Sequence, residues 1–230
     1  ETGSDPRFIL CSATIPNALE HATRLTGCKD FVLVSNDGSP HKRKTLLLWN
    51  PPIRTDDRTR QRIEPLTNIV DLLTEVLTTD GKLFRTIVFG RSRSSVKNAY
   101  RLAQLRLKQY RKERLFKLIR EYTATLLPER REEIFAELAS EKICAIIGTN
   151  ALELGVDIPD MNCYLSIGYP GTMTSVLQQF GRVGRTIDGL GVIVLQDEPL
   201  EQYFARNPRE FFNREPEEVR INPSNFELLW

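Results

Sequence analysis

The segment with the clearest chemical signature lies in the C-terminal third of the chain and reads Gln178-Gln179-Phe180-Gly181-Arg182-Val183-Gly184-Arg185. A helix running through this segment would place Gln178, Arg182 and Arg185 on one stripe, since residues four and seven apart share a helix face. Gly181 and Gly184 would each cost about 1 kcal/mol relative to alanine in that helix, which predicts close approach of a backbone or a ligand. Two guanidinium groups pointing the same way fit a phosphorylated ligand, and the alternative is a solvated arginine face.

Two further groups of polar residues directly follow apolar runs that are typical of buried strands. Thr149 and Asn150 follow residues 143–148, and the Thr149 hydroxyl with nearby backbone N–H groups would suit a phosphate. The alternative for Thr149 is a simple helix N-cap. The segment Gly90-Arg91-Ser92-Arg93 follows residues 86–89, where serine can cap the next helix and two arginines concentrate positive charge.

The elements that must position these residues alternate between strand and helix. Strand-like apolar runs occur at residues 86–89, 118–122, 143–149, 163–167 and 191–195, with helical segments between them, including residues 128–139. This alternation predicts a parallel sheet covered on both faces, which binds ligands at the carboxyl ends of its strands. Upstream, we expect a helix at residues 17–25 and short strands at residues 8–11, 31–34 and 45–49.

The positive charge of the chain is concentrated in one stretch. The net charge is only +2, yet residues 82–131 contain 15 Lys or Arg against three acids, so the rest of the chain is net acidic. A local basic field of this kind attracts phosphate backbones even when the whole protein is nearly neutral. The alternative is a solvated helix face.

The composition, with 40% hydrophobic and 27% charged residues among 230, is typical of a soluble intracellular protein, and we expect a cytoplasmic location. The apolar runs are far shorter than the roughly 20 residues that a membrane helix needs, and we expect no signal peptide. The four cysteines form no CxxC pair, which indicates neither a zinc site nor a disulfide framework. Cys144 lies in an apolar run and is interpreted as a buried small hydrophobe.

The arginine segment resembles motif VI of superfamily 2 helicases, QxxGRxGR, and other motifs of that family follow in the family's order. Residues 149–159 resemble motif V, residues 90–95 motif IV, and Ser12-Ala13-Thr14 motif III. The resemblance implies a RecA-like three-layer α/β/α fold with a mostly parallel central sheet. It also implies that Arg182 and Arg185 reach the γ-phosphate of ATP, that Asp157 with Gly155 faces the nucleotide, and that Thr149 contacts the nucleic-acid backbone.

A finer resemblance is to the Hrq-type and MrfA-type helicases, relatives with a C-terminal zinc-binding region that act in DNA repair. It rests on Trp49-Asn50-Pro51-Pro52, residues 149–155, Gly168-Tyr169-Pro170-Gly171, and residues 199–203 with 207–212. The resemblance implies 3′-to-5′ movement on single-stranded or partly duplex DNA. Motif III would couple nucleotide state to strand movement.

The chain contains no GxxxxGK[ST] loop, so it lacks the phosphate cradle of an NTPase and should be inactive alone. We therefore expect the C-terminal half of a helicase, whose first RecA-like domain would hold most of the ATP and Mg²⁺ in cis. Residues 1–28 would be a remnant of that first domain, 29–60 a linker and first strand region, 61–213 the second RecA-like domain, and 214–230 the start of a following region. Alternatives are a non-catalytic nucleic-acid-binding module, an RNA helicase domain, or an unrelated α/β protein that binds a phosphorylated metabolite.

Overall fold

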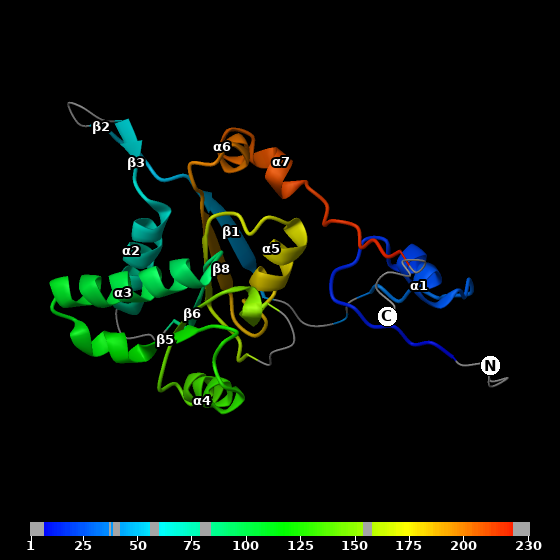
Figure 1. Cartoon of the computed structure of the whole chain (residues 1–230), viewed down its shortest axis with the longest axis horizontal. Helices are drawn as coiled ribbons and strands as arrows, with labels where there is room; N and C mark the ends of the chain where they lie inside the picture. The colour runs from blue at the N-terminus through cyan, green and yellow to red at the C-terminus, as the bar shows by residue number, and fades with distance from the viewer. Residues whose placement is uncertain are drawn as a thin grey trace. The chain divides into compact units, whose positions relative to one another are not determined.

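The chain divides into two compact units, one made of residues 1–39 with 215–230 and the other of residues 40–214 (Figure 1). The computed structural model describes residues 7–36, 38, 42–55, 60–78, 84–153 and 158–222. Within these ranges, no helix combines the length and the apolar character that a membrane span requires.

Among its described residues, the smaller unit contains one helix, α1 (Ala18–Thr26), close to the predicted residues 17–25, and the helix ends at Gly27 with φ of +78°. The side chain of Asn17 exchanges hydrogen bonds of 3.0 and 3.1 Å with the backbone of Val219, which joins the N-terminal segment to the C-terminal one. The strands predicted at residues 8–11 and 31–34 are wrong: these residues form no ladder and are mostly exposed. An apolar run becomes a strand only where a neighbouring strand accepts its hydrogen bonds.

The larger unit is built on a six-stranded sheet in the order β1-β8-β7-β4-β6-β5, and every neighbouring pair is parallel. Its strands are β1 (Lys44–Trp49), β4 (Thr86–Phe89), β5 (Ile119–Tyr122), β6 (Ala145–Gly148), β7 (Cys163–Ile167) and β8 (Gly189–Val194). The central strands β4, β6 and β7 are buried on both faces, which explains why they appear in the sequence as unbroken apolar runs.

Helices cover both faces of this sheet and give the three layers that the sequence predicts. On one face, α2 (Pro65–Thr78) and α3 (Arg93–Gln109) pack their apolar stripes onto the sheet. On the other face lie α4 (Pro128–Ala139), α5 (Met173–Phe180), α6 (Pro199–Arg206) and α7 (Pro208–Phe212). The described part of this unit also contains two 3₁₀ helices, η1 (Glu113–Leu118) and η2 (Asn150–Leu152).

A separate two-stranded antiparallel hairpin, β2 (Ile53–Thr55) with β3 (Arg60–Arg62), follows β1 and stands apart from the sheet (Figure 1). Among the described residues, the hairpin has no hydrogen-bonded neighbour in the main sheet, so side chains at its base must fix its position.

Candidate functional site

The predicted site residues of the larger unit divide between the two edges of the sheet. The chain passes from the carboxyl end of β7 into α5 and returns to the amino end of β8, so α5 begins at one edge and ends at the other. Residues 90–93 and 149–150 follow strands and lie at the carboxyl edge. Arg185 lies beyond the end of α5, toward the amino edge.

The helix predicted to run through both arginines is wrong, because α5 ends at Phe180. Gly184 has φ of +73°, and Val183 forms a bridge with Met161 that ties the chain to the beginning of the sheet. Arg182 therefore leaves from the turn after α5 and Arg185 from a bend, and they share no helical stripe with Gln178, which is half-buried on α5.

The close approach that the two glycines predict is confirmed, and the approaching groups belong to the protein. A Cβ atom on Gly184 would lie 3.0 Å from Cγ of Lys44 and 3.3 Å from Cα of Gly189. A Cβ atom on Gly181 would lie 2.8 Å from the carbonyl oxygen of Leu177, at the end of α5. Both glycines let the arginine segment pack tightly where a larger residue would displace it.

Arg185 is held through its backbone while its side chain is exposed. Its N–H donates to Oδ1 of Asp160 at 3.0 Å, and Thr186 donates to Oδ2 through its N–H at 2.6 Å and its hydroxyl at 2.7 Å. Burial alone would raise the pKa of Asp160, but these hydrogen bonds outweigh it and the pKa is lowered. Asp160 therefore stays ionised and fixes the arginine segment without neutralising the guanidinium by a direct ion pair.

Lys44 adds a third positive charge close to this edge. Burial lowers the pKa of its ammonium group, Asp160 opposes that change, and Arg185 adds to it. The Arg185 guanidinium, the Lys44 ammonium and the Asp160 carboxylate are thus close enough to influence one another. Together they form a positively charged edge with one fixed negative group.

Arg182 contacts a buried polar network that the sequence did not reveal. Its guanidinium donates to the carbonyl oxygen of Glu153 at 2.7 Å. The carboxylate of Glu153 is buried and accepts hydrogen bonds from the Ser175 hydroxyl at 2.8 Å and from the Gln179 amide at 3.0 Å. Gln179 in turn accepts the hydroxyl hydrogen of Tyr164 at 2.9 Å, and burial raises the pKa of that phenol.

A signal for this network was present in the sequence. Gln179 lies three residues after Val176 and six after Met173, which places a polar side chain on the buried stripe of α5. A buried amide requires partners, and Glu153 is the carboxylate within the apolar stretch that follows Thr149. The partner itself follows only from the fold.

At the carboxyl edge, the structure brings the segments after three strands around one hollow of about 150 Å³. Its lining is largely polar and comes from the ends of β4, β6 and β7 and from α5; it includes Gly90, Arg91, Asn150, Glu153, Ser166, Ser175 and Gln179. The hollow lies where the parallel-sheet rule places ligands. Glu153 and Gln179 line it and also belong to the network that holds Arg182.

The backbone on each side of this hollow is fixed by caps. Thr149 is the N-cap of η2 and accepts the Ala151 N–H at 3.4 Å, so the simple capping interpretation describes its contacts within the chain. Ser92 caps α3 in a capping box with Ser95, with hydrogen bonds of 3.1 and 3.0 Å, as the sequence predicts.

The two arginines of this edge differ in their partners. Arg91 lies 2.8 Å from Glu198 and 3.5 Å from the buried Glu201, so its charge is largely offset, contrary to the predicted concentration of positive charge. Burial raises the pKa of Glu201, against hydrogen bonds from the backbone of Gln196 and Tyr169 and the attraction of Arg91. Arg93 is exposed and has no ion pair with any residue that the structure describes.

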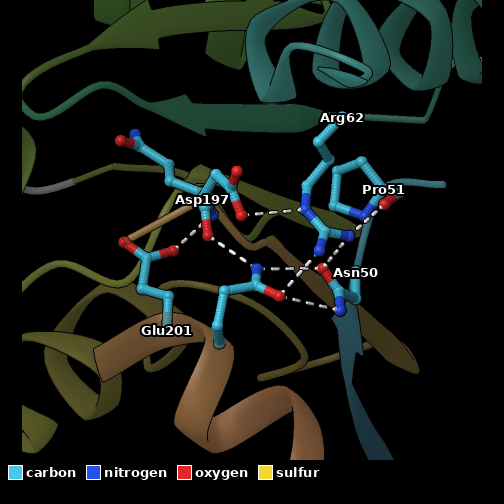
Figure 2. A network of polar contacts seen from close by, with 7 residues as sticks. Asn50, Pro51, Arg62, Asp197 and Glu201 are labelled. Carbon is cyan, nitrogen blue, oxygen red and sulfur yellow. Dashed lines mark hydrogen bonds and ion pairs between the residues drawn. The ribbon is translucent and has the colours of Figure 1, made fainter. Parts of the chain in front are cut away.

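Next to this edge, a polar network fixes the base of the β2–β3 hairpin (Figure 2). The Arg62 guanidinium donates to Oδ1 of Asn50 at 2.9 Å, the carbonyl oxygen of Pro51 at 2.5 Å and Oε1 of Gln202 at 2.8 Å, and it lies 3.3 Å from Asp197. One side chain thereby joins the hairpin to the end of β1 and to α6.

Three parts of the predicted site are not placed by this geometry. Gly155 and Asp157 lie outside the described residues. Ser12, Ala13 and Thr14 belong to the smaller unit, which is described by itself. Among the described residues, no group of His, Cys, Asp or Glu side chains is arranged to hold a metal ion.

The fold and the two-edged site define a RecA-like α/β domain of the kind found in helicases, and comparisons with known proteins agree. Residues 68–187 match the family model described as the helicase conserved C-terminal domain. The chain is 41% identical over 99% of its length to the uncharacterized ATP-dependent helicase YprA of Bacillus subtilis, of which it covers 29%. It is 32% identical over 98% of its length to the ATP-dependent helicase hrq1 of Schizosaccharomyces pombe, of which it covers 21%.

Among solved structures, the chain resembles the DUF1998 helicase MrfA bound to DNA, with a TM-score of 0.88 and 40% identity over 99% of this chain and 29% of that one. The chain belongs to the helicase conserved C-terminal domain family, within superfamily 2. It spans less than a third of the length of each of these relatives.

Proposed function

We propose that the chain is the C-terminal RecA-like half of an ATP-dependent DNA helicase that acts in DNA repair. The observation that carries this proposal is the division of the motif residues between two edges of one sheet, joined through Glu153. The names of the relatives support ATP dependence, and the structural relative is a helicase bound to DNA. Residues 1–28 would complete the first RecA-like domain, which would bind in cis.

At the amino edge, the proposal assigns ATP binding to the arginine segment. Arg185 is exposed on a fixed backbone, and the Arg182 guanidinium is positioned by its hydrogen bond to the carbonyl oxygen of Glu153. Both would face the γ-phosphate together with Gln178 and Asp157, while Gly155, Gly181 and Gly184 keep the backbone close. Bound ATP with Mg²⁺ would supply the phosphoryl group, and these side chains would stabilise the charge that spreads over its oxygens.

At the carboxyl edge, the proposal assigns the backbone of a single DNA strand to Thr149, Asn150 and the segment 90–93. The Thr149 hydroxyl and the exposed charge of Arg93 suit phosphate oxygens. Binding of ATP would close the cleft between the two RecA-like domains. This closure would move the carboxyl edge relative to the first domain and so step the protein along the DNA strand.

The decisive experiment measures ATP hydrolysis by a chain extended upstream through the first RecA-like domain, with and without single-stranded DNA. Arg185→Ala should lower DNA-stimulated turnover by about a thousandfold, which is typical of an arginine finger. Arg206→Ala removes an exposed arginine of α6 and serves as the matched control. Turnover that is indifferent to both DNA and Arg185→Ala would refute the proposal and leave the fold assignment intact.

A separate variant tests the DNA edge. Thr149→Ala should weaken single-strand binding and translocation in the same extended chain. Because Thr149 also caps η2, Thr149→Ser is the matched variant: serine keeps the cap and the hydroxyl, and should retain most of the binding. Equal affinity and translocation in all three proteins would remove Thr149 from the DNA site.

A further inference from the structure

One face of α3 carries a straight row of positive charge, of which the proposed site uses only Arg93. Arg93, Lys97, Arg101 and Lys108 lie within about 80° of one another around the helix axis and span about 22 Å along it. All four are exposed. The buried stripe of the same helix, Val96, Ala99, Ala103 and Leu107, faces the sheet.

The charges of this row lack partners that other basic residues of the same region have. Arg106, on the side of α3 toward α2, lies 3.0 Å from Asp71, and Arg120 lies 2.8 Å from Glu137. Lys97, Arg101 and Lys108 form no ion pair within the part of the chain that the structure describes. The row is therefore an uncompensated positive surface.

This arrangement works against the stability of the helix itself. Residues 91–112 contain eight Lys or Arg and no Asp or Glu, and no acid stands in the first turn of α3. Like charges four residues apart, as in Arg93 with Lys97 and Lys97 with Arg101, destabilise a helix. A solvated helix face ordinarily mixes the two signs, whereas an anionic partner would offset the repulsion of a single-sign row.

We infer that this row, the α3 track, binds the phosphate backbone of the DNA strand as it leaves the carboxyl edge. The track begins at Arg93, directly after the capped segment that the proposed function assigns to the strand, so the two surfaces are continuous. A straight row of cations about 22 Å long matches several successive phosphates. The inference rests on the proposed function and adds a second, longer contact to it.

The test uses the chain itself and fluorescence anisotropy with labelled single-stranded oligonucleotides of about 8 and about 20 nucleotides, one within and one beyond the roughly 4–16 nucleotides that a single-strand-binding OB fold covers. Replacing Lys97, Arg101 and Lys108 with glutamine should weaken binding of the long oligonucleotide at least about tenfold. The slope of log affinity against log salt should fall by about 2, since each single-strand phosphate contact contributes about 0.7. Binding of the short oligonucleotide should stay unchanged.

The control variant replaces Lys42, Arg43 and Lys142, which are exposed basic residues near the amino ends of the strands, and makes the same change in net charge. Two outcomes would refute the DNA contact of the α3 track. One is an equal loss of affinity in the two triple variants, and the other is a loss of affinity seen only with duplex DNA. Failure of the proposed function has a different signature: the unsubstituted chain would bind neither oligonucleotide, or Arg185→Ala would leave turnover unchanged in the extended chain.

Discussion

The side-chain amide of Gln179 donates to the carboxylate of Glu153 at 3.0 Å in the interior of the domain, and the carbonyl oxygen of the same Glu153 accepts the Arg182 guanidinium at 2.7 Å. Glu153 thus holds one of the two family arginines while its carboxylate lines the hollow at the carboxyl edge. Glu153 therefore links the hollow at the carboxyl edge to the Arg182 guanidinium through direct contacts.

Removing the carboxylate should destabilise the domain. Glu153→Ala would leave the buried Gln179 amide and the Ser175 hydroxyl without their acceptor, which costs about 1–3 kcal/mol for each unpaired buried group. Glu153→Gln should cost less, because the Ser175 hydroxyl can rotate to accept from the new amide. Urea unfolding measures both, with Glu132→Ala on the exposed face of α4 as the control. Equal stability of the Glu153→Ala and Glu132→Ala proteins would contradict this account.

The Arg62 network makes a second prediction, for the β2–β3 hairpin. Arg62 is only 14% exposed and its planar guanidinium contacts Asn50, Pro51 and Gln202 at once. Lysine has one donor centre and does not reproduce this fork, so Arg62→Lys should lower the free energy of unfolding by about 1–3 kcal/mol. It should also speed proteolytic cleavage within the hairpin. Arg54→Lys, at an exposed position of β2, should change neither measurement.

Much of the fold was predictable because the local residue pattern of each element matches its burial in the structure. The central strands are continuous apolar runs, and α4 begins at Pro128, which fits the first helical position, as the sequence predicted. The capping of α3 by Ser92 was equally local. Such elements need no knowledge of distant neighbours.

The errors arose where distant neighbours decide. The end of α5 depends on the bridge between Val183 and Met161, which a helical pattern cannot show. The partners of Arg91 are Glu198 and Glu201, which lie more than a hundred positions away in the sequence. The residues around Arg91 therefore could not show that its charge is offset. Pairing of buried polar groups is likewise a property of the fold.

The four free cysteines should fall into two groups that differ in how quickly a thiol reagent modifies them. Cys11 and Cys28 are exposed, whereas burial raises the pKa of Cys144 to about 11 and that of Cys163 to about 12. The thiolate is the reactive form, so at about pH 8 iodoacetamide should modify the first pair quickly and the second only after unfolding. Mass spectrometry after digestion identifies the modified sites. Rapid modification of Cys144 in the native chain would show that the α2–α3 side of the core opens readily.

The carboxylate of Asp160 should make the free energy of unfolding fall as the pH becomes acidic. Its pKa in the folded chain lies below the ordinary 3.8, because hydrogen bonds from Arg185 and Thr186 outweigh its burial. An acid whose pKa is lowered on folding contributes stability that is fully present above its unfolded pKa. This contribution is lost as the pH falls through its folded pKa. The contribution should therefore be constant at neutral pH and vanish in strong acid.

Asp160→Asn tests this directly, because asparagine does not titrate and presents an amide to one of the donors. The variant should be less stable than the native chain by about 1 kcal/mol at about pH 7, a modest figure because Asp160 is only half-buried. The difference should be smaller at about pH 3, because the contribution of an acid whose pKa is lowered on folding declines once the pH falls below the unfolded value of 3.8. Urea unfolding at both pH values gives the two differences. A difference that stays constant or grows in acid would mean that packing, and not the charge of Asp160, holds the Arg185 segment.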